Sequence, residues 1–363
     1  MEIELKKLGE ITTGNTPSKK DGSYWNSEDI CFVKPDRIAD EGITLINDSS
    51  EYISENARSK ARVVSKDAVF VTCIGSIGKI GIASSGDYAF NQQINVIEPN
   101  EKVLPRYLAY NLSYSKPRLE AIANAPVVPI INKTQFGDFK LNIEEDRAKQ
   151  AEIVSVLDKL TGIIEYRKIE LESFDELIKA RFVELFGDMI LNPNGWEQSS
   201  LGKVCDVRDG THDSPKYYME GYPLVTSKNV TSGKIDFSDC SLICEDDYEK
   251  INQRSKVDYG DILMPMIGTV GNPVIVDVEP KFAIKNVALI KFYEDSSVLN
   301  TFVKGLLESD YFDRAVISKV RGGTQKFIAL GNIRELQISI PPMNIQLDYQ
   351  YFVQQVDKSK SVA

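Results

Sequence analysis

The chain has 363 residues, of which 42% are hydrophobic and 26% charged, and its formal net charge is −10. This composition excludes an intrinsically disordered protein, and the length predicts two domains with a connecting element. No stretch reaches the roughly 20 apolar residues of a membrane helix, and the N-terminus lacks the apolar run of a signal peptide, so we expect a cytoplasmic protein.

The first 145 residues are predicted to form short strands with few helices. Runs of Val, Ile and Phe bounded by Asp, Asn, Gly and Pro are typical of strands. Such runs are ICFVKPDRI (30–38), RVVSKDAVFVTCIG (62–75) and NQQINVIEP (91–99). A helix is expected over residues 105–112, and the Ile-Gly-x-x-Gly run at Gly75 and Gly78 favours a tight turn over a phosphate-binding loop.

The next segment predicts one long amphipathic helix. Apolar residues follow a spacing of three and four over residues 153–185, a pattern that indicates a heptad stripe and a helix of about 50 Å. The stripe, an expected interface with a partner helix, contains Leu157, Leu160, Ile164, Leu171, Phe174, Ile178 and Leu185. Arg167 and Arg181 interrupt it and are expected to extend towards solvent or pair with neighbouring Glu. Gly187, Pro193 and Gly195 then end the helix.

The second half of the chain repeats this order. Strand-like runs are YPLVTSKNV (222–230), DYGDILMPMIG (258–268), NPVIVDV (272–278) and KNVALIKF (285–292). Helices are expected over residues 298–308, with a continuation to 315, and over 345–358 at the position equivalent to the long helix. The fold class is therefore α+β, with two similar domains and helical connecting elements.

Internal matches support duplication of a whole domain. Leu8-Gly9 matches Leu201-Gly202, and the run 74–78 matches 267–271, both at an offset of 193 residues. A repeat this long is not a solenoid. A duplicated domain without catalytic residues suggests a ligand with two parts.

The side chains exclude several kinds of catalytic site. His212 is the only histidine, which argues against a Ser-His-Asp triad and against a multi-histidine metal centre. The odd count of five cysteines indicates reduced thiols, and no second pair accompanies Cys240 and Cys244, so no metal site is expected. Neither a phosphate-binding loop nor a dinucleotide-binding motif is present. We therefore expect a protein that is not itself an enzyme.

The acidic net charge argues against nucleic acid as a partner, but its distribution weakens that argument. Between Glu144 and Asp188 there are 12 acidic and 7 basic side chains, so the long helix and its flanks carry half of the net charge. The remaining surface is only mildly acidic and can present basic faces.

The order of these features resembles the specificity subunits of type I restriction-modification systems. The motifs that carry the resemblance are Leu8–Ile11, Leu201–Val204, Gly210–Pro215, Phe90–Ile97, Gly323–Ile328 and Ile338–Pro342, the last followed by Gln346. Two departures stand out. Residues 143–146 replace the family's double proline, although Gln150 follows, and the second helix is shorter than the family's distal helix, as in a truncated or alternative form.

The resemblance implies a division of labour. Residues 1–145 and 191–341 would be target-recognition domains, each reading half of a split double-stranded DNA site. Residues 146–190 and 342–363 would be coiled-coil-like spacer helices that set the distance between the halves and dock two modification (methyltransferase) subunits. Methylation and cleavage would belong to the modification and restriction subunits, which use S-adenosylmethionine, ATP and Mg²⁺, and this chain would hold no cofactor.

Candidate DNA contacts are polar side chains at strand ends. Arg and Lys suit guanine or phosphate, and Asn and Gln suit adenine. Residues at matching places in the two copies are preferred. The candidates are Lys34, Arg37, Lys79, Gln92, Gln93, Lys228, Asn229, Lys285, Asn286, Arg321, Gln325 and Lys326.

Three alternatives stay open. The chain could be a specificity subunit of a related combined restriction-modification system, or a coiled-coil interaction protein without specific DNA binding. It could also be a DNA methyltransferase or nuclease, which would need catalytic motifs that the sequence lacks.

Overall fold

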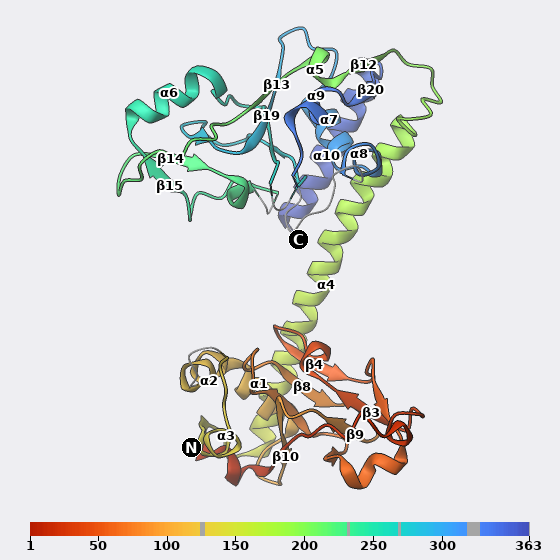
Figure 1. Ribbon diagram of the computed structural model, residues 1–363, viewed down its shortest axis with the longest axis vertical. Helices are drawn as coiled ribbons and strands as arrows, with labels where there is room; N and C mark the ends of the chain where they lie inside the picture. The colour runs from red at the N-terminus through yellow and green to blue at the C-terminus, as the bar shows by residue number, and fades with distance from the viewer. Residues whose placement is uncertain (124–127, 231–232, 268–269, 318–326, 363) are drawn as a thin grey trace. The chain divides into compact units, whose positions relative to one another are not determined.

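The computed structural model describes residues 1–123, 128–230, 233–267, 270–317 and 327–362, and the chain divides into unit 1 (residues 1–164) and unit 2 (residues 165–363) (Figure 1). Each unit contains a layered arrangement of sheets and helices, which confirms the α+β class. In the described part of the chain, no helix has the combination of length and apolarity that a membrane crossing needs.

Unit 1 contains three sheets. The largest has the strand order β2-β10-β7-β8-β4, the second has the order β5-β3-β9-β6, and β1 pairs with β11. The strands are β1 (Glu2–Glu4), β2 (Gly9–Thr13), β3 (Ile30–Val33), β4 (Ile43–Ile46), β5 (Tyr52–Ile53), β6 (Val63–Val64), β7 (Val69–Thr72), β8 (Ile80–Ala83), β9 (Tyr88–Phe90), β10 (Ile94–Pro99) and β11 (Lys140–Asn142). The helices are α1 (Pro105–Tyr114), α2 (Lys116–Ile122) and α3 (Lys133–Asp138), with short 3₁₀ turns η1 (Leu5–Lys7), η2 (Gly22–Tyr24), η3 (Pro35–Arg37) and η4 (Glu55–Lys60).

Both faces of the largest sheet are buried, because its strands alternate between two cores. Val69 and Val71 of β7 pack with Leu108 and Leu112 of α1, whereas Phe70 between them packs with the residues of β3 and β9. Side chains alternate along a strand, so a continuous apolar run serves two faces at once. The sheet is therefore a middle layer between α1 and the second sheet.

Unit 2 repeats this plan. Its sheets have the orders β13-β19-β16-β17, β15-β14-β18 and β12-β20. The strands are β12 (Gln198–Ser200), β13 (Cys205–Asp209), β14 (Tyr222–Val225), β15 (Ser241–Ile243), β16 (Ile262–Pro265), β17 (Val274–Ile275), β18 (Ala283–Ile284), β19 (Val287–Phe292) and β20 (Gln337–Ser339). The helices are α5 (Leu201–Val204), α6 (Glu245–Ser255), α7 (Asn300–Leu307), α8 (Asp310–Ala315) and α9 (Leu330–Arg334), with the 3₁₀ turn η5 (Ser227–Val230).

The pairing of strands confirms the duplication. The largest sheet of unit 1 contains the parallel pair β4 and β8. In the second sheet, β3 and β9 are parallel neighbours, and β14 and β18 are the corresponding parallel pair of unit 2. These two corresponding pairs place the end of an early strand beside the end of a strand about 60 residues later. The internal matches in the sequence therefore correspond to one topology formed twice.

The long helix α4 (Arg147–Phe186) has 40 residues and is longer than the predicted 153–185, while α10 (Met343–Val362) extends the predicted 345–358 at both ends. Arg167 and Arg181 pair with Glu170 and Glu184 at 2.6 and 2.8 Å, as expected for charges within the apolar stripe.

Two expectations about local structure were wrong. The run 30–38 was read as one strand, but β3 ends at Val33 because Pro35 has no N–H to donate and begins η3. The helix α6 was missed because it lacks an apolar period of its own. It forms with Glu245, Asp246 and Asp247 in its first turn, where carboxylates interact favourably with the helix dipole.

A buried glutamine holds the start of each connecting helix. The Gln150 Oε1 accepts a hydrogen bond from the Leu104 N–H at 2.8 Å, and its Nε2 donates to the Lys102 and Glu144 carbonyls at 2.9 and 2.7 Å. Gln150 is completely buried. One side chain thereby connects α4 to the loop that precedes α1.

Gln346 does the same at the start of α10. Its Oε1 accepts from the Leu299 N–H at 2.8 Å, and its Nε2 donates to the Ser297 and Pro341 carbonyls at 2.9 and 2.8 Å. Gln346 is also completely buried. The glutamines noted in the sequence therefore orient both helices on their domains.

We expect Gln346→Ala to lower the free energy of unfolding of unit 2 by about 2 to 4 kcal/mol, because three backbone groups lose their buried partner. The measurement is urea unfolding followed by tryptophan fluorescence in a Trp25→Phe background. The chain has two tryptophans, and Trp196 then reports on the core of unit 2 alone.

The matched control is Gln355→Ala on the exposed side of α10, which should change the free energy by less than about 0.5 kcal/mol. Equal losses in the two variants would show that Gln346 contributes no more than any helical glutamine.

Candidate functional site

The predicted polar residues gather at the ends of the parallel strands in each unit. In unit 1 the Asn91 N–H donates to the Val33 carbonyl at 3.2 Å, which brings the turn after β9 beside the segment after β3. In unit 2 the Lys285 N–H donates to the Val225 carbonyl at 2.9 Å in the same way. Ligands of α/β sheets commonly bind beyond the carboxyl ends of parallel strands. Two equivalent candidate sites result, one in each unit.

A third segment completes each site. In unit 1, Gly14 and Asn15 donate backbone hydrogen bonds to the Ile94 and Phe90 carbonyls at 3.1 and 3.0 Å. This segment follows β2 and lies across the turn after β9. We name residues 14–18 the clamp loop of unit 1 and residues 91–93 its amide turn.

The corresponding segment of unit 2 makes the same bonds. Gly210 and Thr211 donate to the Val287 and Ile284 carbonyls, both at 3.0 Å. Residues 210–214 are the clamp loop of unit 2, and residues 285–286 are its amide turn.

Glycine is required at the start of both clamp loops. A Cβ at Gly14 would lie 2.2 Å from the Asn91 carbonyl oxygen, and a Cβ at Gly210 would lie 2.3 Å from the Ile284 carbonyl oxygen. Real Cβ contacts are essentially never this short, and backbone atoms cannot rotate away. The matching glycines in the sequence therefore mark a close approach of two backbone segments.

In each unit, a side-chain hydrogen bond connects the clamp loop to the amide turn at an equivalent position. The Thr16 hydroxyl donates to the Gln92 Oε1 at 3.0 Å in unit 1. In unit 2, the His212 Nδ1 lies 2.7 Å from the Asn286 Oδ1. Thr16 and His212 were not among the predicted contact residues, although the similarity of residues 14–18 to 210–215 in the sequence was a signal for them.

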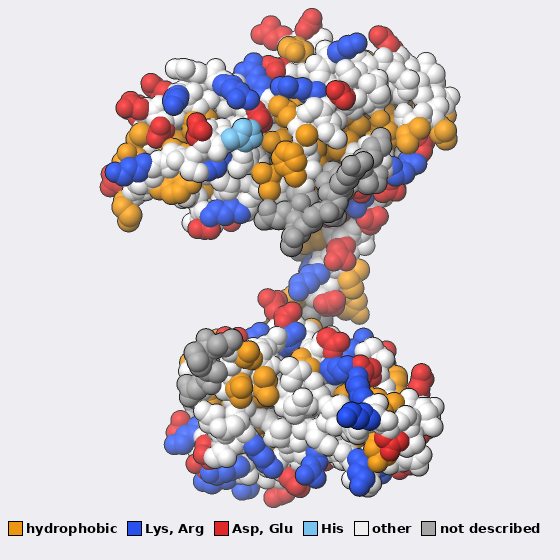
Figure 2. All heavy atoms as spheres, in the orientation of Figure 1, with side chains coloured by type: hydrophobic (Ala, Val, Ile, Leu, Met, Phe, Trp, Pro, Cys, Tyr) orange, Lys and Arg blue, Asp and Glu red, His pale blue; other side chains and the backbone are white. Residues whose placement is uncertain are grey.

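Most cations at the two sites are paired with carboxylates. Lys34 pairs with Glu51, Arg37 pairs with Asp48, and the Lys228 Nζ lies 2.7 Å from Asp239. The Lys34 ammonium lowers the pKa of the Glu51 carboxyl chiefly through their hydrogen bond. Figure 2 shows basic and acidic side chains next to each other on the visible face of each unit. Binding of a polyanion would have to displace these carboxylates from their cations.

Two predicted residues have other roles. Asn229 is buried, its Oδ1 accepts from the Thr226 backbone and hydroxyl, and its Nδ2 donates to the Asp236 carbonyl. Its amide is therefore engaged within the fold, which does not favour the predicted contact with DNA. Lys79 directly precedes β8 of the largest sheet, and its Nζ lies 2.9 Å from Asp40. It belongs to neither amide turn.

Of the remaining predicted residues, some lie in the amide turns and others lie outside the described part of the chain. Gln93 lies in the amide turn of unit 1, where its Oε1 accepts from the Asn91 amide at 2.8 Å. Three candidates lie outside the described residues, namely Arg321, Gln325 and Lys326.

The apolar stripe of α4 is covered over only part of its length. Ile178 and Leu185 pack against the core of unit 2, and Phe174 is half-buried. In the N-terminal half, Leu157 is half-buried, and the exposed residues are Leu160, Ile164 and Leu171 at 51, 58 and 38%.

The helix α10 covers the C-terminal turns of α4. The Tyr349 ring contacts the rings of Phe182 and Phe186, and Lys360 pairs with Asp175 at 2.6 Å. The two helices therefore run antiparallel. Among the described residues, the ion pair and ring contacts between α4 and α10 lie at Asp175 and beyond it.

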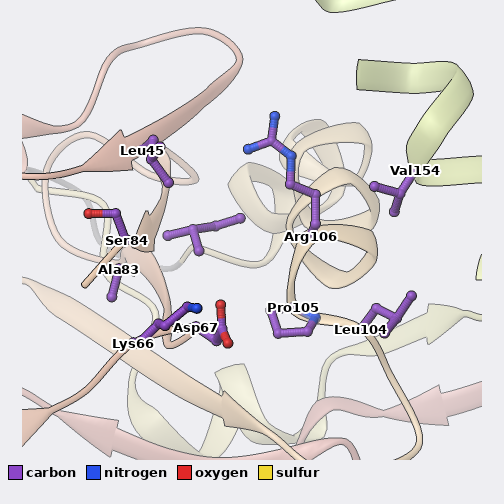
Figure 3. Close-up of a pocket in the computed structure, with 10 residues that line it drawn as sticks. Leu45, Lys66, Asp67, Ala83, Ser84, Leu104, Pro105, Arg106 and Val154 are labelled. Atoms are coloured by element: carbon purple, nitrogen blue, oxygen red, sulfur yellow. The ribbon is translucent and has the colours of Figure 1, made fainter. Parts of the chain in front are cut away.

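Unit 1 also has a pocket of about 390 Å³ beside the exposed part of the stripe (Figure 3). Leu45, Ala83 and Ser84 lie on one side of it, and Pro105 and Arg106 at the start of α1 lie on the other, with Val154 of α4 at its edge. None of the predicted DNA-contacting residues lines it. A mainly apolar pocket next to an exposed helix stripe is suited to a protein partner.

Comparisons with known proteins give a consistent family. The sequence pattern described as "Type I restriction modification DNA specificity domain" matches residues 1–173 and 193–361. The specificity subunit of the type I restriction enzyme MjaIX from Methanocaldococcus jannaschii is 25% identical, over 97% of this chain and 85% of that protein. The specificity subunit of EcoR124I/EcoR124II from Escherichia coli is 27% identical, over 49% of this chain and 48% of that protein.

Solved structures show the same fold. The type I restriction-modification S subunit from M. genitalium superposes with a TM-score of 0.57 at 14% identity, and the match covers 99% of this chain and 90% of the other. A chain from a structure on complex assembly and conformational transition of the type I R-M system superposes with a TM-score of 0.55 at 17% identity. That match covers 100% of this chain and 91% of the other.

Proposed function

The chain belongs to the family of type I restriction-modification DNA specificity domains, and we propose that its two units each read one half of a bipartite DNA site through the clamp loop and the amide turn. It is a DNA sequence-recognition subunit, and methylation and cleavage are carried out by partner subunits. The observation that supports the proposal most directly is the equivalence of the two sites, which presents an amide side chain at the end of a parallel strand pair in each unit.

The chemistry of the sites fits recognition of base edges. Amide groups bond base edges in the major groove, and the flanking Lys34, Arg37, Lys228 and Lys285 can contact phosphates. Three of these cations have carboxylate partners, which weaken the electrostatic attraction for DNA of any sequence. Contacts with base edges would therefore supply a larger share of the binding energy. In this proposal the partners supply all cofactors, S-adenosylmethionine for methylation and ATP with Mg²⁺ for cleavage.

We propose that the partner surface is the exposed part of the α4 stripe, together with the pocket in Figure 3. Exposed apolar side chains along a helix are suited to packing against another helix. The stripe and the pocket would dock modification subunits, two of them for two half-sites, and the length of α4 would set the separation of the half-sites.

The proposed function is tested by a domain exchange. The bipartite site is first read by methylome sequencing of cells that carry the chain with its modification subunit. Replacing residues 191–341 with the matching residues of a relative should then change one half of the methylated site and leave the other half and its spacing intact.

The same complexes should bind their DNA with an affinity that falls steeply with salt, because phosphate contacts release counterions. A change in both halves after the exchange, or equal affinity for all sequences, would contradict the two-site proposal. The latter result would favour a coiled-coil interaction protein.

A further inference from the structure

Both ring nitrogens of His212 face oxygen atoms, and an amide or carboxylate oxygen can only accept hydrogen bonds. Its Nδ1 is 2.7 Å from the Asn286 Oδ1, and its Nε2 is 2.9 Å from an oxygen of the Asp209 carboxylate. A neutral imidazole carries one N–H and can donate to only one of them. With the amide oxygen of Asn286 turned towards the ring, both bonds form together only when the ring is protonated. The geometry therefore describes an imidazolium that is held at both nitrogens.

The charged groups around the ring come from three elements. Asp209, at the end of β13, is buried and also accepts a hydrogen bond from Arg254 of α6. Lys285, in the amide turn, donates to the Ser214 hydroxyl at 2.6 Å, and Asp213 follows His212 in the clamp loop. The imidazolium and the Arg254 guanidinium thus share one carboxylate.

These surroundings raise the pKa of His212 above its ordinary value. The main cause is the hydrogen bond to Asn286, followed among the raising effects by the hydrogen bond and the charge of Asp209, while burial and the charge of Arg254 oppose it. The charged form therefore persists to a higher pH than it does in an unperturbed histidine. The ring is also accessible: its side chain is 59% exposed, and it is the pale blue group at the surface of unit 2 in Figure 2.

Unit 1 performs the same task with a group that does not titrate. The Thr16 hydroxyl donates to the Gln92 Oε1 at any pH near neutrality. In both units the bridge occupies the amide oxygen. Among the described residues, no acceptor is found for the Gln92 Nε2 or the Asn286 Nδ2. Each amide turn therefore presents two N–H donors with no acceptor beside them.

This arrangement predicts the class of base edge that is read. Adenine recognition by Asn or Gln uses the amide oxygen and nitrogen together. Here one of the two lone pairs of each oxygen is already engaged and the oxygen is turned towards the clamp loop, whereas the nitrogen carries both of its hydrogens free. The N–H donors suit the O6 and N7 acceptors of guanine or the O4 acceptor of thymine.

We propose that the His212 imidazolium is a positioning residue that holds the Asn286 amide N–H group towards a guanine or thymine acceptor. Recognition of the half-site of unit 2 then weakens as pH rises, whereas recognition of the half-site of unit 1 does not. This inference rests on the proposed function of the two units as DNA readers.

The protonation state can be measured directly, because His212 is the only histidine. Full-length chain labelled with ¹⁵N-histidine should give one imidazole spin system, with both nitrogens protonated below the midpoint of its titration. Its midpoint should lie above the usual value of about 6.5. Asp209→Asn should lower that midpoint. A neutral ring at pH 6.5, with the Asn286 amide nitrogen donating to Nδ1, would overturn the proposal without any DNA.

The second measurement is binding of the complex with its modification subunits to three duplexes. They are the methylome-derived site, the same site with the first half scrambled, and the site with the second half scrambled. Between pH 6.5 and 8.5, discrimination against the scrambled half of unit 2 should fall about tenfold, or about 1.4 kcal/mol. Discrimination against the scrambled half-site of unit 1 should stay constant over this pH range and serves as the internal control.

His212→Thr introduces the hydroxyl group that Thr16 supplies in unit 1. Discrimination at the half-site of unit 2 should then no longer depend on pH. The reciprocal Thr16→His should introduce a pH dependence at the half of unit 1. Equal pH slopes at the two halves, or an unchanged slope in His212→Thr, would overturn the role of His212 alone. Absence of specific binding at every pH would overturn the proposed function itself.

Discussion

The Gly210→Ala variant is expected to lose recognition of the half-site of unit 2 while it keeps recognition of the other half. The added Cβ would lie 2.3 Å from the Ile284 carbonyl oxygen, so the clamp loop must move away from the amide turn. The bridge between His212 and Asn286 then breaks. Affinity for the full site should fall about 100-fold, or about 2.7 kcal/mol, to the level of DNA whose second half is scrambled.

The same change in unit 1 tests the symmetry of the two sites. Gly14→Ala places a Cβ 2.2 Å from the Asn91 carbonyl oxygen and should abolish recognition of the first half only. Gly331→Ala and Gly22→Ala are the matched controls, because a Cβ at either position meets no atom within 4 Å. Circular dichroism checks that the variants are folded. If either clamp-loop variant or a control lost recognition of both half-sites, the two sites would not be independent.

Duplicating residues 165–171 is expected to abolish methylation of the original site and to create a site with a longer spacer. Seven residues add about 10.5 Å and nearly two full turns to α4, so the helix faces keep their orientation. At 3.4 Å per base pair the new spacer should be longer by about three base pairs. Both half-sites should keep their sequences, because neither clamp loop is altered.

Methylome sequencing reads this result directly. A seven-residue replacement of 165–171 by other helix-forming residues keeps the length of α4 and should keep the original spacing. The insertion lies before Asp175, Phe182 and Phe186, so the contacts of these residues with α10 are preserved. An unchanged spacer after the insertion would show that α4 does not set the separation of the half-sites.

Repetition and periodicity were the most informative features of the sequence. The offset of about 193 residues predicted two domains of one fold, and the parallel pairs β3–β9 and β14–β18 confirm it. The heptad stripe predicted α4 because a helix needs only a local pattern of apolar residues. The helix α6 has no such pattern, and its packing on unit 2 could not be foreseen.

Sequence reasoning predicted which candidate residues lie at strand ends but not which side chains they contact. Lys34 and Gln92 lie at strand ends, where strand signals followed by polar residues had put them. The pairing of Lys34 with Glu51 joins residues that are distant along the chain, and no local pattern encodes such a contact. The burial of Asn229 could not be predicted for a similar reason, since it involves a hydrogen bond to Asp236.

By itself the sequence determined the duplication, the long helix and the absence of the recognised catalytic motifs, because these depend on the order and spacing of residues along one chain. Only the tertiary structure decided which side chains meet. Parallel pairing brings strand ends from distant segments together, and the close approach at Gly14 and Gly210 then places Thr16 on Gln92 and His212 on Asn286. The net charge of −10 did not predict the electrostatics of either site, because the pairing of neighbouring charges determines the local potential of each surface.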